Sequence, residues 1–282
     1  MPVVFTMGNF FNYNGKIYKD GNSILSPDSR ALRYGDGLFE TIKVKNGEII
    51  FADEHFARLW KGLSILQFSI PPNFTPHFLQ EEIIALIKES NLLNARVRLS
   101  VFRGEGDLFT IKDNFPNYII QAWSLAEQAG KWNQEGLIMG ICNEVKKSCD
   151  VLSNLKHSNY LPNVFAALQV KQQNWNDAVL LNSFNRVCET TIANIFIIKD
   201  QVICTPALSE GCVAGVMRKV LLNKLLSANY NVKEAAINKD ELLNADEVFV
   251  TNSINAIRWV QAIENRKFDN KMTQEIYSSL IL

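Results

Sequence analysis

The stretch SNLKHSNYLPN (residues 153–163) carries the most information about this chain. A single lysine, Lys156, stands in it, with apolar Leu155 on one side and a run of polar residues on the other. An apolar residue beside a polar run predicts a partly buried lysine. Burial lowers the pKa of a lysine, so its amine becomes neutral and nucleophilic more readily. The alternative is an ordinary surface lysine, which is what most lysines are.

Three further blocks stand in a fixed order around this stretch. Glu189 follows Lys156 by 33 positions in CETTIANIF (residues 188–196). Upstream lie RYGDGLFET (residues 33–41) and EHFARL (residues 54–59). No single block is specific, but the ordered set resembles the class IV aminotransferases, the fold-type IV pyridoxal-phosphate (PLP) enzymes. That family includes branched-chain and D-amino-acid aminotransferases and 4-amino-4-deoxychorismate lyases.

The resemblance implies a fold of mixed α/β (α+β) class in two domains. A small N-terminal α+β domain is expected over residues 1–123 and a larger C-terminal pseudobarrel domain over residues 137–282. Residues 124–136, SLAEQAGKWNQEG, are polar, small and nearly free of β-branched residues, which indicates an interdomain linker. The family also implies a PLP cofactor held between the domains and a homodimer.

Composition excludes several other classes of protein. The 29 basic and 29 acidic residues balance, so no charge pattern indicates nucleic acid or an anionic membrane as a partner. No apolar run approaches the ~20 residues that a membrane span needs. The five scattered cysteines and an N-terminus without signal-peptide features favour a reducing compartment, and we expect the cytoplasm. The three histidines have no zinc-binding spacing, so no metal site is expected.

Periodicity predicts the elements of the first half. Asn14-Gly15 and Asn46-Gly47 are turn signals for two β-hairpins. Helical spacing of apolar residues predicts helices over residues 53–67 and 78–91, and strand character returns at 97–104 and 117–123, which together favour an antiparallel sheet.

The second half is expected to open with a strand at residues 137–142 and a helix at 160–174. Short strands are predicted at 178–182, 193–199 and 201–205, followed by a helix at 215–229. The segment EVFVT (residues 247–251) is predicted to be the last strand before a C-terminal helix.

The resemblance assigns cofactor roles to seven residues. Lys156 would link covalently to PLP and move protons, and Glu189 would hold the proton on the pyridine nitrogen. The phosphate would bind to the backbone amides of Val216 and Met217, at a helix start that suits anions, and to Arg58 and Ser253. Tyr160 would lie beside the 3-hydroxyl of the cofactor. The alternatives are a solvated loop carboxylate for Glu189, an exposed helical charge for Arg58 and a core tyrosine for Tyr160.

Substrate recognition is less defined by the sequence. Tyr34, Phe39 and Thr41 of the second block are candidates, as are Arg98 and Arg103, since arginine binds carboxylates in a bidentate way. For the two arginines, a charge on a strand face is an equally good interpretation.

Comparison with family patterns favours 4-amino-4-deoxychorismate lyase, which forms 4-aminobenzoate and pyruvate. Thr41, the four-residue spacing from Lys156 to Tyr160, the GVMR loop (residues 215–218) and VFRGEG (residues 101–106) resemble the lyases. The segment GDLFTIKDNF (residues 106–115) departs from the lyase pattern and leaves a branched-chain or D-amino-acid aminotransferase as the alternative. A non-catalytic binding protein of the same fold is a third possibility, against which the intact Lys156, Glu189 and Arg58 argue.

Overall fold

The computed structural model describes residues 7–281, and these form two compact units. Unit 1 comprises the described residues up to Ala129 together with Leu155–Asn159, and unit 2 comprises Gly130–Asn154 and the chain from Tyr160 onward. The chain therefore passes between units inside the predicted linker, whose boundaries remain predictions. Residues 1–6, part of the N-terminus used for the signal-peptide expectation, lie outside the described residues. No helix in the described part of the chain is long and apolar enough to cross a membrane.

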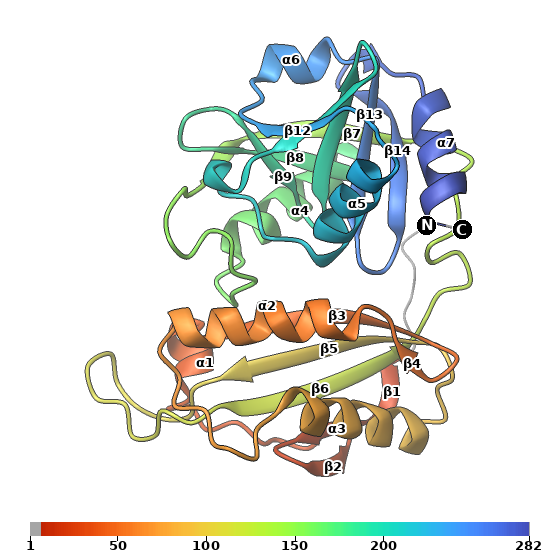
Figure 1. Ribbon diagram of the computed structural model, residues 1–282. Coiled ribbons are helices and arrows are strands. Elements are labelled where there is room, and N and C mark those ends of the chain that lie inside the picture. Colours follow the sequence, from red (N-terminus) through yellow and green to blue (C-terminus); the bar gives the residue numbers. More distant parts are fainter. Residues whose placement is uncertain (1–6, 282) are drawn as a thin grey trace. The chain divides into compact units, whose positions relative to one another are not determined.

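Unit 1 is built on an antiparallel sheet with the strand order β2-β1-β6-β5-β3-β4 (Figure 1). Its strands are β1 Met7–Tyr13, β2 Lys16–Lys19, β3 Gly37–Lys45, β4 Glu48–Ile49, β5 Ala95–Phe102 and β6 Asn117–Ser124. Its helices are α1 Arg30–Tyr34, α2 Ala52–Ile65 and α3 Pro76–Glu89. The predicted antiparallel sheet and the two long helices are confirmed.

Both predicted hairpins of this unit are also confirmed. Asn14 and Gly15 join β1 to β2 with φ of 49° and 83°, and Asn46 and Gly47 join β3 to β4 with φ of 52° and 80°. Positive φ at both central residues is the geometry of a type I′ turn, which asparagine and glycine adopt at low cost.

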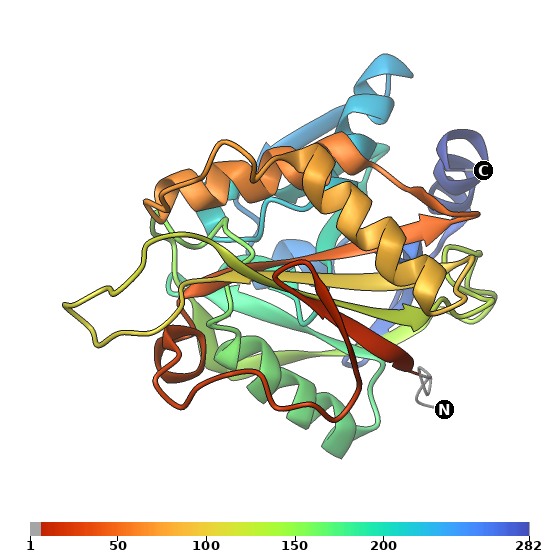
Figure 2. The same ribbon diagram turned by 90° about the horizontal axis from the view of Figure 1, so that it is seen from below.

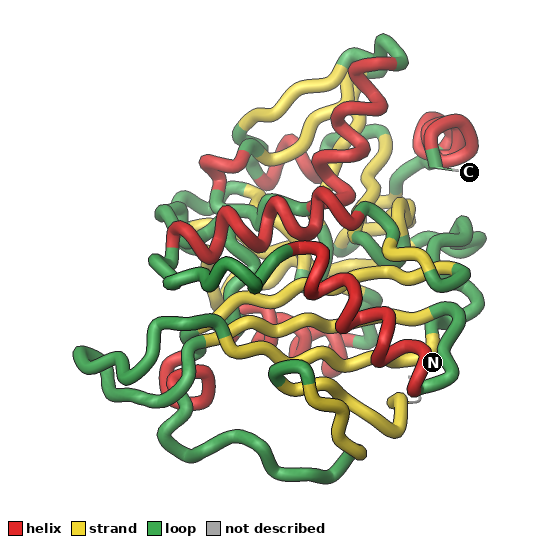
Figure 3. The backbone as a smooth tube through the Cα atoms, turned by 60° about the horizontal axis from the view of Figure 1, so that its bottom comes forward, coloured by secondary structure: helices red, strands yellow, loops and turns green. Residues whose placement is uncertain are grey.

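The two faces of the unit 1 sheet differ in character. Leu38, Ile42 and Val44 of β3 pack with α2 and α3 in a single core, which also takes residues from β5 and β6. Helix α2 lies against β3, and α3 lies against β1 and β6 (Figure 2). Figure 3 shows both helices, in red, on the same side of the yellow strands. Because side chains alternate along a strand, Phe39, Thr41 and Lys43 point to the opposite face.

Unit 2 contains a mixed sheet that curls into a half-barrel (Figure 1). The described strands follow the order β12-β11-β10-β13-β14-β7-β8-β9, with β15 paired to β14. The bounds are β7 Leu137–Lys147, β8 Asp177–Asn182, β9 Val187–Thr190, β10 Asn194–Lys199, β11 Val202–Pro206, β12 Val232–Ala235, β13 Glu247–Asn252, β14 Ala256–Ile263 and β15 Arg266–Lys267.

Helices surround this sheet and close its core. They are α4 Leu161–Gln173, α5 Val216–Ser227, α6 Lys239–Leu243 and α7 Lys271–Leu280, with a 3-10 turn η1 at Leu208–Glu210. The rings of Phe196 on β10 and Phe249 on β13 stack at 4.9 Å between centroids. Helix α7 begins where the Glu247 carboxylate accepts hydrogen bonds from the backbone of Met272 and Thr273, both at 2.8 Å. The carboxylate thus satisfies amides that a helix start leaves unpaired.

The prediction that EVFVT is the last strand before the C-terminal helix is wrong, since β14 and β15 follow it. In β14 the buried residues are Ile257, Val260 and Ile263, three positions apart, and the pairing with β7 shifts register after Val260. This irregularity removes the two-residue alternation by which a half-buried strand is identified in a sequence.

Candidate active site

The segment around Lys156 extends the edge of β3 in unit 1. Phe39 donates its backbone N–H to the carbonyl of Lys156 at 2.8 Å, and Ser158 donates to the carbonyl of Gly37 at 2.9 Å. Leu155 is buried in the unit 1 core, while Lys156 itself is half-buried. These contacts fix the backbone on both sides of the lysine, so its side chain starts from a defined position on the sheet edge.

Two cations lie over the ring of Phe39. The Lys156 ammonium is 4.4 Å from the ring centroid, and the Arg98 guanidinium is 3.8 Å from it. Thr41 lies directly opposite Arg98 in the register of β3 and β5. The structure therefore brings Lys156, Phe39, Thr41 and Arg98 of the predicted set onto one face of the sheet. Attraction between a cation and an aromatic face holds both side chains against the ring.

Arg58 lies in a buried polar cluster at the helix-covered side of the sheet. Its Nε donates to Oε1 of Glu40 at 2.8 Å, a terminal nitrogen pairs with Oε2, and Nδ1 of His55 lies 2.7 Å from Oε2. Burial alone would raise the pKa of the Glu40 carboxyl, but the Arg58 charge and the hydrogen bonds from His55 and Arg58 lower it to about 2. Glu40 thus orients Arg58, whose predicted phosphate role stays a prediction.

This cluster gives a pH-dependent prediction for stability. The pKa of Glu40 drops from 4.5 to about 2, so ionised Glu40 stabilises the fold fully above its unfolded-state pKa and loses this effect as pH falls toward 2. Glu40→Gln should lower the free energy of unfolding by about 3 kcal/mol at pH 7, and the difference from wild type should shrink below pH ~5.

Urea unfolding at several pH values measures the effect. Glu81→Gln, which changes an exposed glutamate beside His77, is the control and should stay within about 0.5 kcal/mol of wild type. A Glu40→Gln penalty that is the same at pH 7 and pH 3 contradicts the prediction.

Two other substrate candidates lie at one end of the sheet. Arg103 is buried, with Nε donating to Asn114 at 2.7 Å, one terminal nitrogen on Asp36 at 2.6 Å and the other on the carbonyl of Leu66. Tyr34 ends α1 and is flanked by two arginine side chains. The donors of Arg103 bind protein acceptors and Nε of Arg98 donates to Oγ of Ser100 at 3.2 Å, so the contact of either arginine with a substrate carboxylate stays a prediction.

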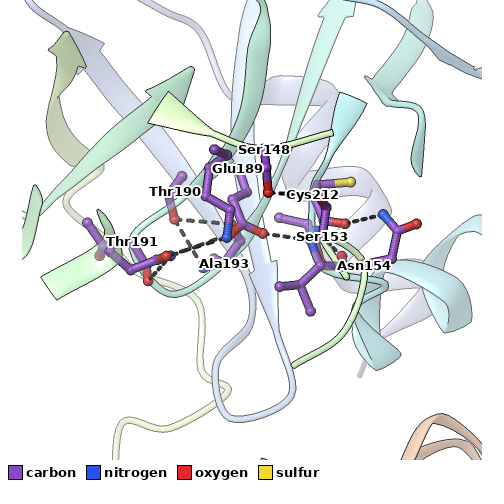
Figure 4. Close-up of polar contacts among 12 residues, drawn as sticks. Ser148, Ser153, Asn154, Glu189, Thr190, Thr191, Ala193 and Cys212 are labelled. Carbon is purple, nitrogen blue, oxygen red and sulfur yellow. Dashed lines mark hydrogen bonds and ion pairs between the residues drawn. The ribbon is translucent and has the colours of Figure 1, made fainter. Parts of the chain in front are cut away.

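Glu189 lies in unit 2 on β9, in a cluster of buried polar groups (Figure 4). Its Oε1 is 2.9 Å from Nζ of Lys147 and accepts from Nδ2 of Asn163 at 3.4 Å. Its Oε2 accepts the backbone N–H of Val213 at 2.8 Å. The side chain is 3% exposed, so Glu189 is a strand residue in the interior and not a solvated loop carboxylate.

The loop that precedes α5 is held in place by asparagine side chains. The side-chain amide of Asn154 donates to the carbonyl of Cys212 at 2.7 Å. The backbone carbonyl of Asn154 accepts from the N–H of Ala214 at 3.0 Å. Asn194 donates to the carbonyl of Val213 at 2.9 Å. A Cβ atom on Gly215 would lie 1.9 Å from Oδ1 of Asn194, so only glycine allows this close approach.

The start of α5 has the features of an anion site. Val216 and Met217 form its first turn, and the N-cap Gly215 offers no side chain to cap their amides. Thr251 lies opposite Asn194 in the β10–β13 pairing, and its buried hydroxyl has no hydrogen-bond partner within residues 7–281. A buried hydroxyl without a partner costs about 1–3 kcal/mol, which indicates that an acceptor belongs there.

Ser253 and Tyr160 lie at two other edges of unit 2. Ser253 stands in the turn between β13 and β14, two residues after Thr251. Tyr160 is the N-cap of α4, and its ring centroid is 5.8 Å from Nζ of Lys147. Both are half-exposed, and their predicted cofactor contacts stay predictions.

Comparison with known proteins identifies the family. The family model of amino-transferase class IV matches residues 37–263. This chain belongs to the class IV aminotransferases. An aminodeoxychorismate lyase of Vibrio harveyi is 33% identical over 267 residues, covering 89% of this chain and 93% of the relative. A D-alanine aminotransferase of Bacillus licheniformis is 26% identical, covering 90% of this chain and 88% of the relative.

The fold agrees with this assignment. The structure of a branched-chain amino acid aminotransferase from Escherichia coli superimposes with a TM-score of 0.84 at 20% identity, covering 95% of this chain and 92% of that one. The predicted fold-type IV architecture is confirmed, and so is the prediction of a PLP-dependent enzyme, because class IV aminotransferases use this cofactor.

The unit 2 residues fit PLP. The buried Glu189 carboxylate suits a protonated pyridine nitrogen, because Oε2 accepts from the Val213 amide and a carboxylate oxygen can accept a second hydrogen bond. The uncapped amides of α5 and the unpaired Thr251 hydroxyl suit a phosphate. Val213 connects the ring-nitrogen partner with the phosphate site, since its N–H binds Glu189 and it lies three residues before α5.

Several residues of these clusters escaped the sequence analysis. Glu40 stands between buried Leu38 and Ile42 in a strand, and a carboxylate at a core position of an alternating pattern is a usable signal. Lys147 was missed because the strand was predicted to end at residue 142, whereas β7 continues to Lys147. Nothing in the sequence pairs Asn163 or Thr251 with the site.

Proposed function

We propose that this class IV enzyme is a 4-amino-4-deoxychorismate lyase. The observation that carries the proposal is the 33% identity, over 89% of the chain, to the Vibrio harveyi aminodeoxychorismate lyase. Thr41, the four-residue spacing from Lys156 to Tyr160 and the GVMR loop support the same activity.

Lys156 and Glu189 carry the chemistry in this proposal. Bound PLP would supply the electron sink for breaking a bond at the amine-bearing carbon of the substrate. Lys156 takes the proton from that carbon, and Glu189 keeps the ring nitrogen protonated. Loss of the enolpyruvyl group as pyruvate then leaves the aromatic ring of 4-aminobenzoate.

Cationic residues on the Phe39 face of unit 1 suit a substrate with two carboxylates, which 4-amino-4-deoxychorismate has. Lys43 and Arg96 lie directly opposite each other in the β3–β5 register, two positions along from Thr41 and Arg98. Burial lowers the pKa of both Lys43 and Arg96. Lys43 donates to the backbone carbonyl of Ala129 at 3.3 Å and the Arg96 guanidinium lies over the ring of Trp123, so both positive charges are held on this face.

The alternative is a branched-chain or D-amino-acid aminotransferase, and a specific observation favours it. The segment at residues 106–115 lacks the lyase pattern, and in the structure Asn114 of this segment instead holds Arg103. As a transaminase, the enzyme would use Lys156 to move a proton from the substrate Cα to the cofactor carbon.

Products distinguish the two activities. The enzyme should release 4-aminobenzoate and pyruvate from 4-amino-4-deoxychorismate without any keto acid, because a lyase returns its cofactor to the aldehyde level at every turnover. A transaminase stops at pyridoxamine phosphate unless a keto acid is present. Leucine, glutamate and D-alanine, each with 2-oxoglutarate, are the comparison substrates, and Lys156→Ala is the blank for both reactions. Rapid conversion to pyridoxamine phosphate by leucine or D-alanine, with no 4-aminobenzoate formed, rejects the lyase.

We also propose that the chain is a cytoplasmic homodimer. The five cysteines are unpaired, as a reducing compartment allows. Helix α4 presents a stripe of exposed apolar side chains at helical spacing, Leu161, Val164, Phe165 and Leu168, as a face for a second copy. Light scattering that gives the mass of a single chain at micromolar concentration rejects the dimer.

A further inference from the structure

Lys147 is a buried lysine whose ammonium group points at Glu189. It lies at the end of β7 and is 7% exposed. Its Nζ is 2.9 Å from Oε1 of Glu189 and 3.5 Å from Oδ1 of Asn163. Its neighbour Lys146 is less buried and points to the other face of the strand.

A lysine in this position needs an explanation. Removing two charges from water costs several kcal/mol per ion, so an apolar pair of similar size would often stabilise the fold better. Glu189 also has other donors, Asn163 on Oε1 and the Val213 amide on Oε2. Stability alone therefore does not account for the pair, whereas a role at the site does.

We infer that Lys147 is a positioning residue for the cofactor-binding carboxylate. It orients the Glu189 carboxylate before the cofactor binds, and it shares that carboxylate with the ring nitrogen afterwards. The inference rests on the proposed role of Glu189. A positive charge beside the carboxylate lowers the affinity of the Glu189–ring nitrogen pair for its shared proton. Lys147 thereby sets how firmly the ring stays protonated.

The two buried thiols near this pair do not titrate in the relevant pH range. Burial raises the pKa of the neighbouring Cys188 thiol well above its usual value. Burial likewise raises the pKa of Cys212 to about 12. Both thiols thus remain neutral. The centroid of the Tyr160 ring lies 5.8 Å from Nζ of Lys147.

The first experiment uses the cofactor-free protein. Lys147→Met, Glu189→Gln and the double variant form a cycle of urea-unfolding measurements, with Lys146→Met as the matched control. The single changes should each lower the unfolding midpoint, and Lys147→Met should cost much less in the Glu189→Gln background. Additive effects of the two changes overturn the inference.

The second experiment reads the shared proton directly. PLP labelled with ¹⁵N in the ring is bound to wild type, Lys147→Met and Lys147→Arg, and its chemical shift is followed between pH 6 and 10. In Lys147→Met the midpoint of ring-nitrogen deprotonation should rise by about one pH unit, a tenfold gain in proton affinity. Lys147→Arg, which keeps the charge, should behave like wild type. Lys147→Gln replaces the methionine variant if that variant does not fold.

The outcomes separate this inference from the proposed function. An equal midpoint in Lys147→Met and wild type, with the cofactor linked normally to Lys156, overturns the role of Lys147 alone. Absence of the lysine-linked cofactor from wild type overturns the proposed function first.

Discussion

Lys156→Ala should remove the visible absorbance of the lysine-linked cofactor and lower turnover by about 10⁴-fold or more, since the lysine is both the covalent anchor and the proton carrier. The fold should persist, because Lys156 docks on β3 through its backbone carbonyl, which alanine also has. Absorbance spectra and steady-state rates with the preferred substrate measure the effect.

Lys199→Ala is the matched control for this change. Lys199 is an exposed lysine of unit 2 that binds Asp246 at 2.7 Å. Its removal should leave both spectrum and rate unchanged. A Lys156→Ala protein that keeps the absorbance band and turns over at the wild-type rate contradicts the assignment.

Glu189→Gln should still link the cofactor to Lys156 but slow turnover by about 10²–10⁴-fold. Breaking a buried charge pair by changing one partner costs about 3–5 kcal/mol, and each ~1.4 kcal/mol lost from the transition state is tenfold in rate. An amide cannot balance a protonated ring nitrogen as a carboxylate does. Single-turnover rates of proton removal, measured by the loss of deuterium from labelled substrate, give the size of the effect.

Glu247→Gln is the control for replacing a buried carboxylate. Glu247 is buried and accepts from the backbone at the start of α7, so this change should reduce stability while leaving turnover per folded molecule unchanged. Equal turnover of Glu189→Gln and wild type would rule out the proton-holding role.

The features that could be predicted from the sequence are those with a local signal. Asn-Gly pairs specify their own turns, and helical apolar spacing located α2 and α3 to within a few residues. The Lys156 and Glu189 blocks could be identified because each is a short run of residues compared with a family pattern. Turn residues, helical spacing and short motifs each lie within a few residues of one another, so a single sequence is enough to recognise them.

Contacts between distant residues could not be predicted in the same way. Arg58 was identified by its match to the EHFARL block, but its partner Glu40 lies 18 residues away on a strand, and only the packing of α2 on β3 joins them. Lys147 meets Glu189 because the parallel pairing of β7 with β8 and the antiparallel pairing of β8 with β9 place three strands side by side. Strand order is a property of the folded chain, and a single sequence does not state it.

The most direct test of this account is borohydride reduction of the purified protein followed by peptide mapping. Reduction fixes the cofactor to whichever lysine holds it, and digestion then identifies that lysine by mass. We expect a yellow protein that loses its colour and carries one pyridoxyl group, on the peptide that contains Lys156. A pyridoxyl group on any other lysine, or none on a protein loaded with PLP, would contradict it.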